Sequence, residues 1–196
     1  MHVNLNNLRQ LSYLFESGSV KKPIVFVGSA GSGKSTVGRR VAKKLKIQFY
    51  DSDKIIEERE GLTVVEIYNR NGHDYFSQRE REVVQEILTT YGVVILSTGS
   101  NAFIDPILHK FIKNNAITVW LHAQLDILAE RISRRNSRPG FTPDNTFVML
   151  REIIDQHYPI YKTADIAVES HKQDIYRVVD NVISKLKKYI ESSLIE

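Results

Sequence analysis

Residues 28–35 offer the clearest chemistry in this chain, because they read Gly-Ser-Ala-Gly-Ser-Gly-Lys-Ser and match the pattern G-x-x-x-x-G-K-S. Glycines let the backbone curl so that successive N–H groups face one anion. The helix N-terminus that follows would add partial positive charge. We therefore expect a phosphate-binding loop with Lys34 on the outer phosphates and Ser35 on Mg²⁺. The residues expected to bind the nucleotide are Gly28, Ser29, Ala30, Gly31, Ser32, Gly33, Lys34, Ser35 and Thr36.

A glycine-rich turn that binds nothing is the alternative. The apolar run at 24–27 directly before the motif and the helical pattern directly after it favour the phosphate loop, because the motif requires a strand–loop–helix context.

A second group of chemically useful residues lies at Asp51 and Asp53, which are separated by one residue and follow a short apolar run. One carboxylate could hold a Mg²⁺-bound water, and the other could orient or deprotonate an alcohol. The alternative is an aspartate that caps the helix expected at 53–60, with Asp51 in a loop. The position of the pair downstream of the phosphate loop favours the catalytic interpretation.

These residues need a scaffold, and the chain alternates apolar runs with helical patterns. Strands are expected at 24–28, 47–50, 93–97, 117–121 and 166–169. Helices are expected at 34–46, 53–60, 63–70, 75–90, 104–114, 124–135, 147–157 and 172–193. Such alternation predicts an α/β fold of three layers, with a five-stranded parallel sheet flanked by helices. Ligands of such sheets bind at the carboxyl ends of the strands.

The composition fits one domain. The chain has 196 residues, no cysteine and a net charge of +4. Disulfides and thiolate metal sites are therefore excluded. No apolar stretch is long enough to span a membrane, so we expect a cytoplasmic protein without a membrane partner. We expect a helical extension over residues 1–20, a single domain over 21–196, and a monomer or weak dimer.

Basic residues gather on the helix expected at 34–46. A nucleic-acid patch is one interpretation, but no aromatic residues or recognition motif accompany the charge. We favour a solvated helix face near a polyanionic nucleotide, and we expect no nucleic-acid partner.

The order of motifs resembles the shikimate kinase family over about residues 23–185. After the phosphate loop, the chain has an F-Y-D-S-D segment, an F-x-x-R-E segment, T-G, R-P, P-x-Y and A-D. The residues that carry these later motifs are Phe76, Arg79, Glu80, Thr98, Gly99, Arg138, Pro139, Pro159, Tyr161, Ala164 and Asp165. The resemblance implies a P-loop kinase that uses ATP and Mg²⁺ to phosphorylate a hydroxyl of a small molecule, in aromatic amino acid biosynthesis.

The resemblance also implies roles for individual residues. Lys34, Asp53 and Arg138 would be catalytic, and Ser35 and Asp51 would hold the metal. Arg131 would cover the adenine, although an exposed helix arginine is the alternative. A lid would extend over about 138–147, where the chain has Pro139, Gly140 and Pro143. The acceptor would lie against Asp53, Ser77, Gly99, Ser100, Arg138 and His157.

The acceptor side departs from the family pattern. The family has arginine at the positions of Ser77 and His157, and three glycines where this chain has Gly99-Ser100-Asn101. Arginine binds carboxylates in a bidentate manner, so the acceptor site differs in charge. His73, Arg79 or Arg81 could compensate, and His157 could equally be an ordinary helix histidine.

Three functions remain open from the sequence. The first is an active kinase of shikimate or a related polyol or cyclitol. The second is a catalytically impaired nucleotide-binding regulatory module, and the third is a nucleoside or nucleotide kinase. A GTPase is disfavoured because the chain has no N-K-x-D segment.

Overall fold

A computed structural model describes residues 5–134, 141–142, 145–171 and 174–194. Its centre is a parallel sheet of five strands in the order β2-β3-β1-β4-β5, which confirms the expected topology class. The strands are β1 (Ile24–Val27), β2 (Gln48–Asp51), β3 (Val94–Ser97), β4 (Ile117–His122) and β5 (Ile166–Glu169). All of them fall at the positions that the apolar runs predict.

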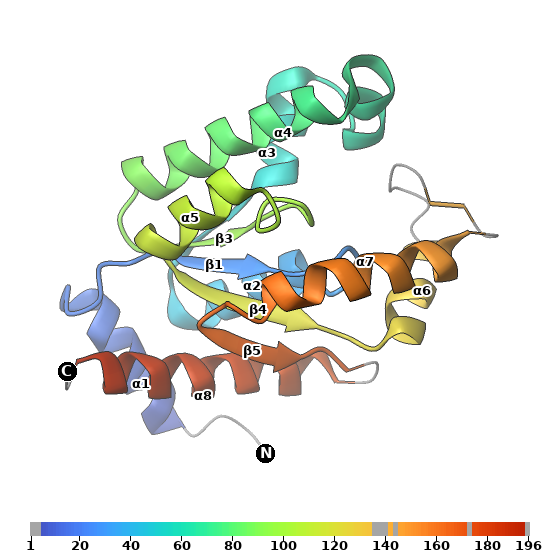
Figure 1. The fold of residues 1–196 in the computed structure, drawn as a ribbon. Helices are drawn as coiled ribbons and strands as arrows, with labels where there is room; N and C mark the ends of the chain where they lie inside the picture. Colours follow the sequence, from blue (N-terminus) through green and yellow to red (C-terminus); the bar gives the residue numbers. More distant parts are fainter. Residues whose placement is uncertain (1–4, 135–140, 143–144, 172–173, 195–196) are drawn as a thin grey trace.

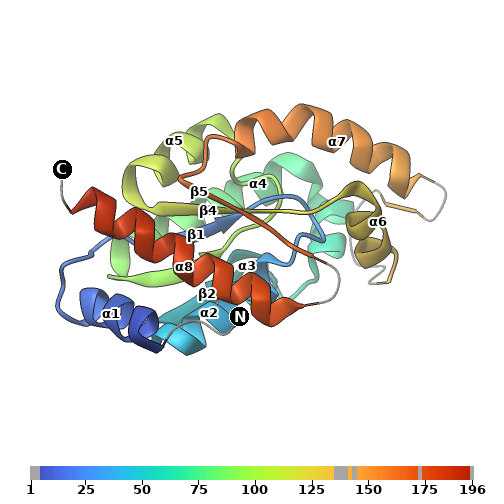
Figure 2. The same ribbon diagram turned by 90° about the horizontal axis from the view of Figure 1, so that it is seen from below.

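Helices cover both faces of the sheet and complete the three layers (Figures 1 and 2). In Figure 1, α1 and α8 lie below the sheet, α2 lies behind its strands, and α3, α4 and α5 lie above it, with α6 and α7 toward the right. The described helices are α1 (Leu5–Glu16), α2 (Lys34–Leu45), α3 (Ser52–Glu60), α4 (Val64–Thr90), α5 (Pro106–Asn115), α6 (Leu125–Ser133), α7 (Thr146–Tyr161) and α8 (Ile175–Ser193).

The central strand β1 shows why the sheet is buried on both faces. Its side chains alternate: Ile24 and Phe26 join the core under α2 and α8, whereas Val25 and Val27 join the core under α4 and α5. All four are fully buried. Parallel strands that are covered on both faces have continuous apolar runs, so the run at 24–27 is the pattern that such a strand requires.

The largest differences from the helix ranges that the sequence predicts concern α4 and α7. The helices expected at 63–70 and 75–90 form a single element, α4, with a non-helical Gly72 inside it (φ 82, ψ 177). Helix α7 continues through Pro159 to Tyr161, although the proline suggested an end at 157. The last turn is held by tertiary contacts, because Tyr158 donates a hydrogen bond to the backbone of Ala123 and Tyr161 donates one to the backbone of Ser100.

The helical segment before the phosphate loop packs on the domain. Leu11 of α1 is fully buried in the core that α2 and α8 share, and Gly18 follows the helix at a positive φ of 72. Among the described residues, no helix is long and apolar enough to cross a membrane.

Candidate active site

The phosphate loop follows β1 and curls at glycines. Gly28, Gly31 and Gly33 have φ values of 137, 78 and 95, in the region where other residues are strained. A Cβ on Gly28 would also collide with the backbone oxygen of Leu121 in β4. Gly33 then caps α2, whose first residue is Lys34. The loop therefore directs its backbone and the N-terminus of α2 toward one region, as the motif predicts.

Lys34 is almost fully buried and lies folded over this loop. Its ammonium donates hydrogen bonds to the backbone oxygens of Gly28 (2.6 Å) and Ser29 (3.0 Å). The Ser32 hydroxyl is buried within the loop and finds no hydrogen-bond partner among the described residues. Buried polar groups normally have a partner, so a loop with an unused hydroxyl fits a phosphate oxygen as its missing acceptor.

A cavity of about 360 Å³, which we call the nucleotide cavity, extends from this loop and is strongly basic. Its lining includes the cations Lys34, Arg40, Arg131 and Arg134 together with Ser35, Thr36 and Thr98. The loop contributes Gly31 and Gly33 to the same cavity. A cavity of this composition suits a polyphosphate, because cations and backbone amides stabilise its negative charge.

Arg131 reaches this cavity from α6. Its guanidinium donates to the backbone oxygen of Gly31 (3.2 Å), to the Ser170 hydroxyl (2.9 Å) and to the backbone oxygen of His171 (2.8 Å). The side chain is therefore held against the nucleotide loop rather than exposed on a helix surface. Its contact with adenine remains a prediction.

The basic helix has a similar explanation. Arg40 lines the nucleotide cavity, Lys44 pairs with Asp180 at 2.7 Å, and Arg39 lies over the Phe49 ring. These contacts use several of the charges of α2 within the fold, and the absence of a nucleic-acid partner stays a prediction.

The metal candidates come together as expected. Asp51 caps α3 by accepting from the backbone N–H of Lys54 at 3.4 Å, so the cap is Asp51 rather than Asp53. Burial raises the pKa of Asp51, whereas a hydrogen bond from Ser35 lowers it. The Ser35 hydroxyl is also 3.2 Å from the hydroxyl of Ser97. A carboxylate and a hydroxyl are hard oxygen ligands, so the pair fits a Mg²⁺ that takes its other ligands from phosphates and water.

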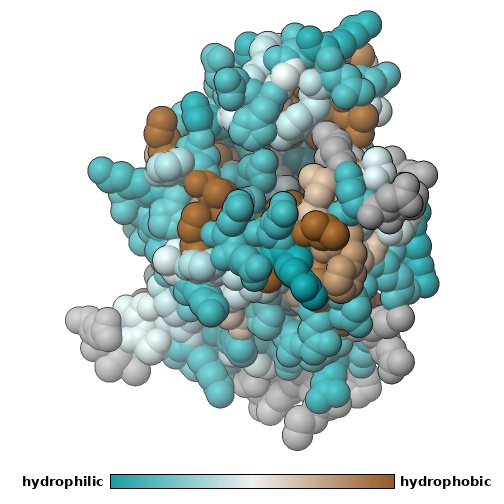
Figure 3. Space-filling model, turned by 45° about the vertical axis from the view of Figure 1, so that its right-hand side comes forward, coloured by the Kyte–Doolittle hydropathy of each residue, from teal (hydrophilic) through white to brown (hydrophobic). Residues whose placement is uncertain are grey.

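Asp53, in the first turn of α3, lines the nucleotide cavity and also a second, smaller cavity of about 170 Å³. The second cavity is bounded by Glu80 and Phe76 of α4, by Gly99, Ser100 and Asn101 after β3, and by Leu150 and Ile153 of α7. Figure 3 turns the carboxyl ends of the strands toward the viewer, and the surface there is largely hydrophilic with scattered hydrophobic residues. We call the smaller cavity the acceptor cavity.

Glu80 is the most perturbed acid of the site. It is buried and accepts hydrogen bonds from the Gly99 N–H (2.8 Å) and the Ser52 hydroxyl (3.3 Å). Burial, followed by the negative charge of Asp53, raises its pKa to about 8. From the sequence, Glu80 was expected only as part of the F-x-x-R-E motif. A glutamate at a buried position of α4 was the signal that it belongs to the site.

Gly99 is required by close packing against these acids. A Cβ at this position would collide with a carboxylate oxygen of Glu80 and would lie 2.9 Å from that of Asp53. Tyr161, fully buried, fixes the next residue by donating its hydroxyl to the Ser100 backbone oxygen. Thus the T-G and P-x-Y motifs meet at one loop of the acceptor cavity.

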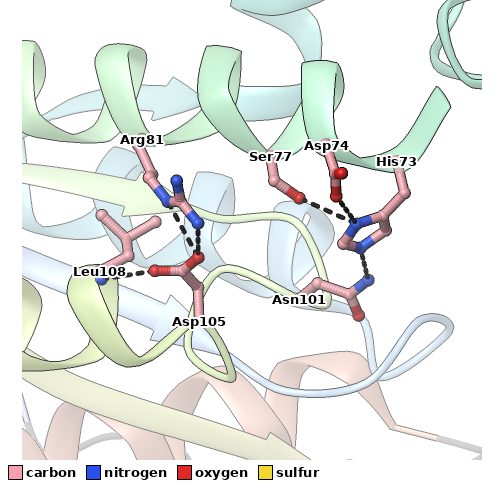
Figure 4. Close-up of polar contacts among 7 residues, drawn as sticks. All are labelled: His73, Asp74, Ser77, Arg81, Asn101, Asp105 and Leu108. Carbon is pink, nitrogen blue, oxygen red and sulfur yellow. Dashed lines mark hydrogen bonds and ion pairs between the residues drawn. The ribbon is translucent and has the colours of Figure 1, made fainter. Parts of the chain in front are cut away.

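Polar residues from α4 approach this loop in Figure 4. Ser77 lies 3.4 Å from Nδ1 of His73, and the side-chain nitrogen of Asn101 lies 3.4 Å from Nε2 of His73. From the sequence, His73 was expected only as a residue that could compensate for the missing arginines, and Asn101 only as a departure from the three-glycine run. Gly99 and Ser100 line the acceptor cavity, whereas Ser77 and His157 are not among its lining residues. The expected contacts of all four with a substrate remain predictions.

The expected compensating arginines are both engaged elsewhere. Arg79 pairs with Glu82 at 2.6 Å and lies 3.5 Å from Glu60. Arg81 pairs with Asp105, whose other oxygen caps α5 (Figure 4). Neither arginine lines the acceptor cavity.

Arg138 lies outside the described residues, as do Pro139, Gly140 and Pro143 of the expected lid. Of the lid range, Phe141 lines the acceptor cavity, and residues 146 and 147 belong to α7. The lid and the role of Arg138 stay predictions.

Comparison with known proteins gives a consistent result. The model of the shikimate kinase family matches residues 30–187. The chain is 34% identical to a shikimate kinase of Bartonella quintana over 89% of its length and 82% of that protein. It is 36% identical to one of Rhodopseudomonas palustris over 86% of its length and 83% of that protein.

The fold comparison agrees. A solved shikimate kinase of Acinetobacter baumannii, in complex with shikimate, matches with a TM-score of 0.81 and 28% identity over 91% of this chain and 97% of that one. Fold and site together define an ATP-dependent P-loop kinase of small molecules. Within that class, the chain belongs to the shikimate kinase family.

Proposed function

We propose that this protein transfers the γ-phosphoryl group of ATP to a ring hydroxyl of shikimate or a related cyclitol. The observation that carries this proposal is the position of Asp53, which lines both the basic cavity of the phosphate loop and the acceptor cavity. A hydroxyl group bound in the acceptor cavity would lie next to the γ-phosphate of ATP, with the carboxylate of Asp53 beside both. Transfer requires this in-line approach and little covalent chemistry from the protein.

The chain's own residues would act as follows. Lys34 and the loop amides hold the outer phosphates and offset their charge. Asp53 orients the acceptor hydroxyl and receives its proton while the new O–P bond forms and the bond between the γ-phosphorus and the bridging oxygen breaks, so that ADP leaves. Ser35 and Asp51 would hold Mg²⁺, which neutralises phosphate charge when bound.

The shikimate kinases to which the chain is similar and the match to the family model support this function. Nothing observed in the described residues favours the regulatory module or the nucleotide kinase. The direct test is an ADP-release assay with shikimate, quinate, gluconate and common cyclitols, followed by mass spectrometry of the product. We expect ATP consumption that depends on one of the ring acceptors. ATP binding without phosphorylation of any of these acceptors would contradict the proposal.

A further inference from the structure

Ser52 separates the two aspartates of the site and is fully buried. It is the first residue of α3 and directly follows Asp51, the last residue of β2. Serine is common at helix starts because its hydroxyl can cap the helix, but the cap of α3 is the side chain of Asp51. The hydroxyl of Ser52 therefore has another purpose, since buried polar groups are retained where they have partners.

The partners of this hydroxyl come from two other parts of the fold. It donates to Oε1 of Glu80 in α4 (3.3 Å) and accepts from the backbone N–H of Gly99 after β3 (3.1 Å). The same Gly99 N–H also donates to Oε1 of Glu80 (2.8 Å). The three groups form a closed, buried triangle, so that one hydroxyl joins the start of α3 to α4 and to the loop after β3.

This triangle lies directly beside the Asp53 carboxylate. Gly99, Glu80 and Asp53 line the acceptor cavity, and a Cβ on Gly99 would meet carboxylate oxygens of both acids. Asp53 is the next residue after Ser52, so a shift of the start of α3 against the Gly99 loop would move its carboxylate within the cavity. Ser52 itself is not among the described lining residues, so it would act through Asp53 rather than on a ligand.

Other contacts hold the neighbouring parts of the site without this hydroxyl. Asp51 is fixed by its strand register with Ser97 and by its cap of the Lys54 N–H. The Gly99 N–H keeps its bond to Glu80 when the hydroxyl is removed. Loss of the hydroxyl should therefore loosen α3 at Asp53 while the metal candidates and the buried amide stay in place.

We propose that Ser52 is a positioning residue for phosphoryl transfer, whose hydroxyl holds the start of α3 against Glu80 and Gly99 and so aims the Asp53 carboxylate at the acceptor hydroxyl. This inference rests on the proposed phosphotransfer function and adds to it a residue that touches neither substrate.

The first test removes the hydroxyl. Ser52→Ala should lower kcat by at least about tenfold with the acceptor that the wild-type protein phosphorylates, because small misplacements of a reacting group are costly. The Kd for ATP–Mg²⁺ should stay at the wild-type value. Unchanged kcat, or an equal loss of ATP affinity, would overturn the inference.

A conservative variant separates the hydroxyl from the volume of the side chain. Ser52→Thr keeps the hydroxyl and should recover most of the lost turnover, whereas Ser52→Cys offers only a weak donor and should be as slow as the alanine variant. The cysteine variant also takes the place of Ser52→Ala if that protein fails to fold. A folded threonine variant as slow as alanine would attribute the loss to packing and contradict the inference.

A double-mutant cycle tests whether Ser52 acts through Asp53. In an Asp53→Asn background, Ser52→Ala should cost less than about twofold in kcat, because the group that it positions no longer accepts the proton. The full tenfold loss in that background would show an independent action and overturn the inference.

Thr118→Val is the matched control, because Thr118 is also fully buried and its hydroxyl also joins two segments. It donates to the side chain of Asp165 (2.6 Å) and accepts from the Asp165 N–H (2.9 Å), outside the described linings of both cavities. The control should lower the thermal unfolding temperature and leave kcat unchanged. An equal fall in its kcat would attribute the effect to general destabilisation and contradict the inference.

The outcomes distinguish this inference from the proposed function. Wild-type phosphotransfer with unaffected Ser52 variants would overturn the role of Ser52 alone. Wild-type protein that binds ATP–Mg²⁺ but phosphorylates no ring acceptor would overturn the proposed function and the inference together.

Discussion

The nucleotide cavity and the acceptor cavity share Asp53 but differ in almost every other respect. The nucleotide cavity is lined by glycines of the phosphate loop and by the cations Lys34, Arg40, Arg131 and Arg134. The described lining of the acceptor cavity consists of acids, neutral polar groups and apolar side chains. The difference shows which ligand brings charge into the site. A polyphosphate needs cations wherever it binds, but an alcohol needs only orientation and a proton acceptor.

The largest expected effect tests the basic cavity. Lys34→Ala should reduce phosphotransfer by at least about 10²–10³-fold, because a charge that stabilises the transferring group is lost. Lys43→Ala, an exposed lysine of the same helix, is the control and should leave turnover unchanged. Steady-state kinetics and thermal unfolding measure both effects. Wild-type turnover in the Lys34 variant would show that the phosphates bind elsewhere.

The residue common to both cavities comes next. Asp53→Asn should lower turnover by about 10²-fold, since the amide cannot receive the hydroxyl proton, while the Kd for ATP stays close to the wild-type value. Asp155→Asn, on the exposed part of α7, serves as the control. If the Asp53 variant instead loses ATP affinity and keeps its turnover, Asp53 belongs to the nucleotide cavity alone.

A smaller effect is expected from close packing in the acceptor cavity. Gly99→Ala places a methyl group against Glu80 and Asp53, and overpacking of this kind costs about 1–3 kcal/mol. We expect a higher KM for the acceptor and an unchanged KM for ATP. Gly92→Ala is matched to it, because a Cβ there meets no atom within 4 Å. Equal kinetics for the two variants would argue against the described loop position.

The last expected effect is on stability rather than on catalysis, and it depends on pH. The pKa of Glu80 is raised to about 8 in the folded protein, from 4.5. Between these values the native state binds more protons than the unfolded state, so the contribution of Glu80 to the free energy of unfolding falls as pH rises. Glu80→Gln should remove this slope, which is at most about 1.4 kcal/mol per pH unit. Urea unfolding of the wild-type protein and the Glu80→Gln variant, at pH values from about 5 to about 8, measures the slope of the free energy of unfolding against pH. Identical slopes for the two proteins would mean that Glu80 ionises normally.

The same contrast explains what could be predicted from the sequence. The nucleotide side is encoded in local spacing, since the glycines, Lys34 and Ser35 are adjacent in the chain and the strand before them is a continuous apolar run. The inner strands β1, β3 and β4 were predicted for the same reason, because burial on both faces requires a continuous apolar run.

The acceptor side is assembled from distant segments and could be predicted only in part. His73 of α4 and Asn101 after β3 have no shared local pattern, and their contact depends on the loop that Tyr161 holds. Helix α7 also continues beyond Pro159, because tertiary contacts stabilise a last turn that local helix propensity disfavours. The sequence also could not show that Arg79 and Arg81 pair with other carboxylates, because these ion pairs depend on the folded structure.

The placement of Asp53 between two cavities has a consequence for how this family can diversify. Among the described lining residues, Arg131 belongs to the nucleotide cavity and Asn101 to the acceptor cavity, so substitutions of these two residues are expected to combine additively in free energy. A double-mutant cycle between Arg131 and Asn101 should therefore give little coupling. An ancestral enzyme could then exchange its acceptor by changing the lining of the acceptor cavity alone, while the machinery for ATP is inherited unaltered.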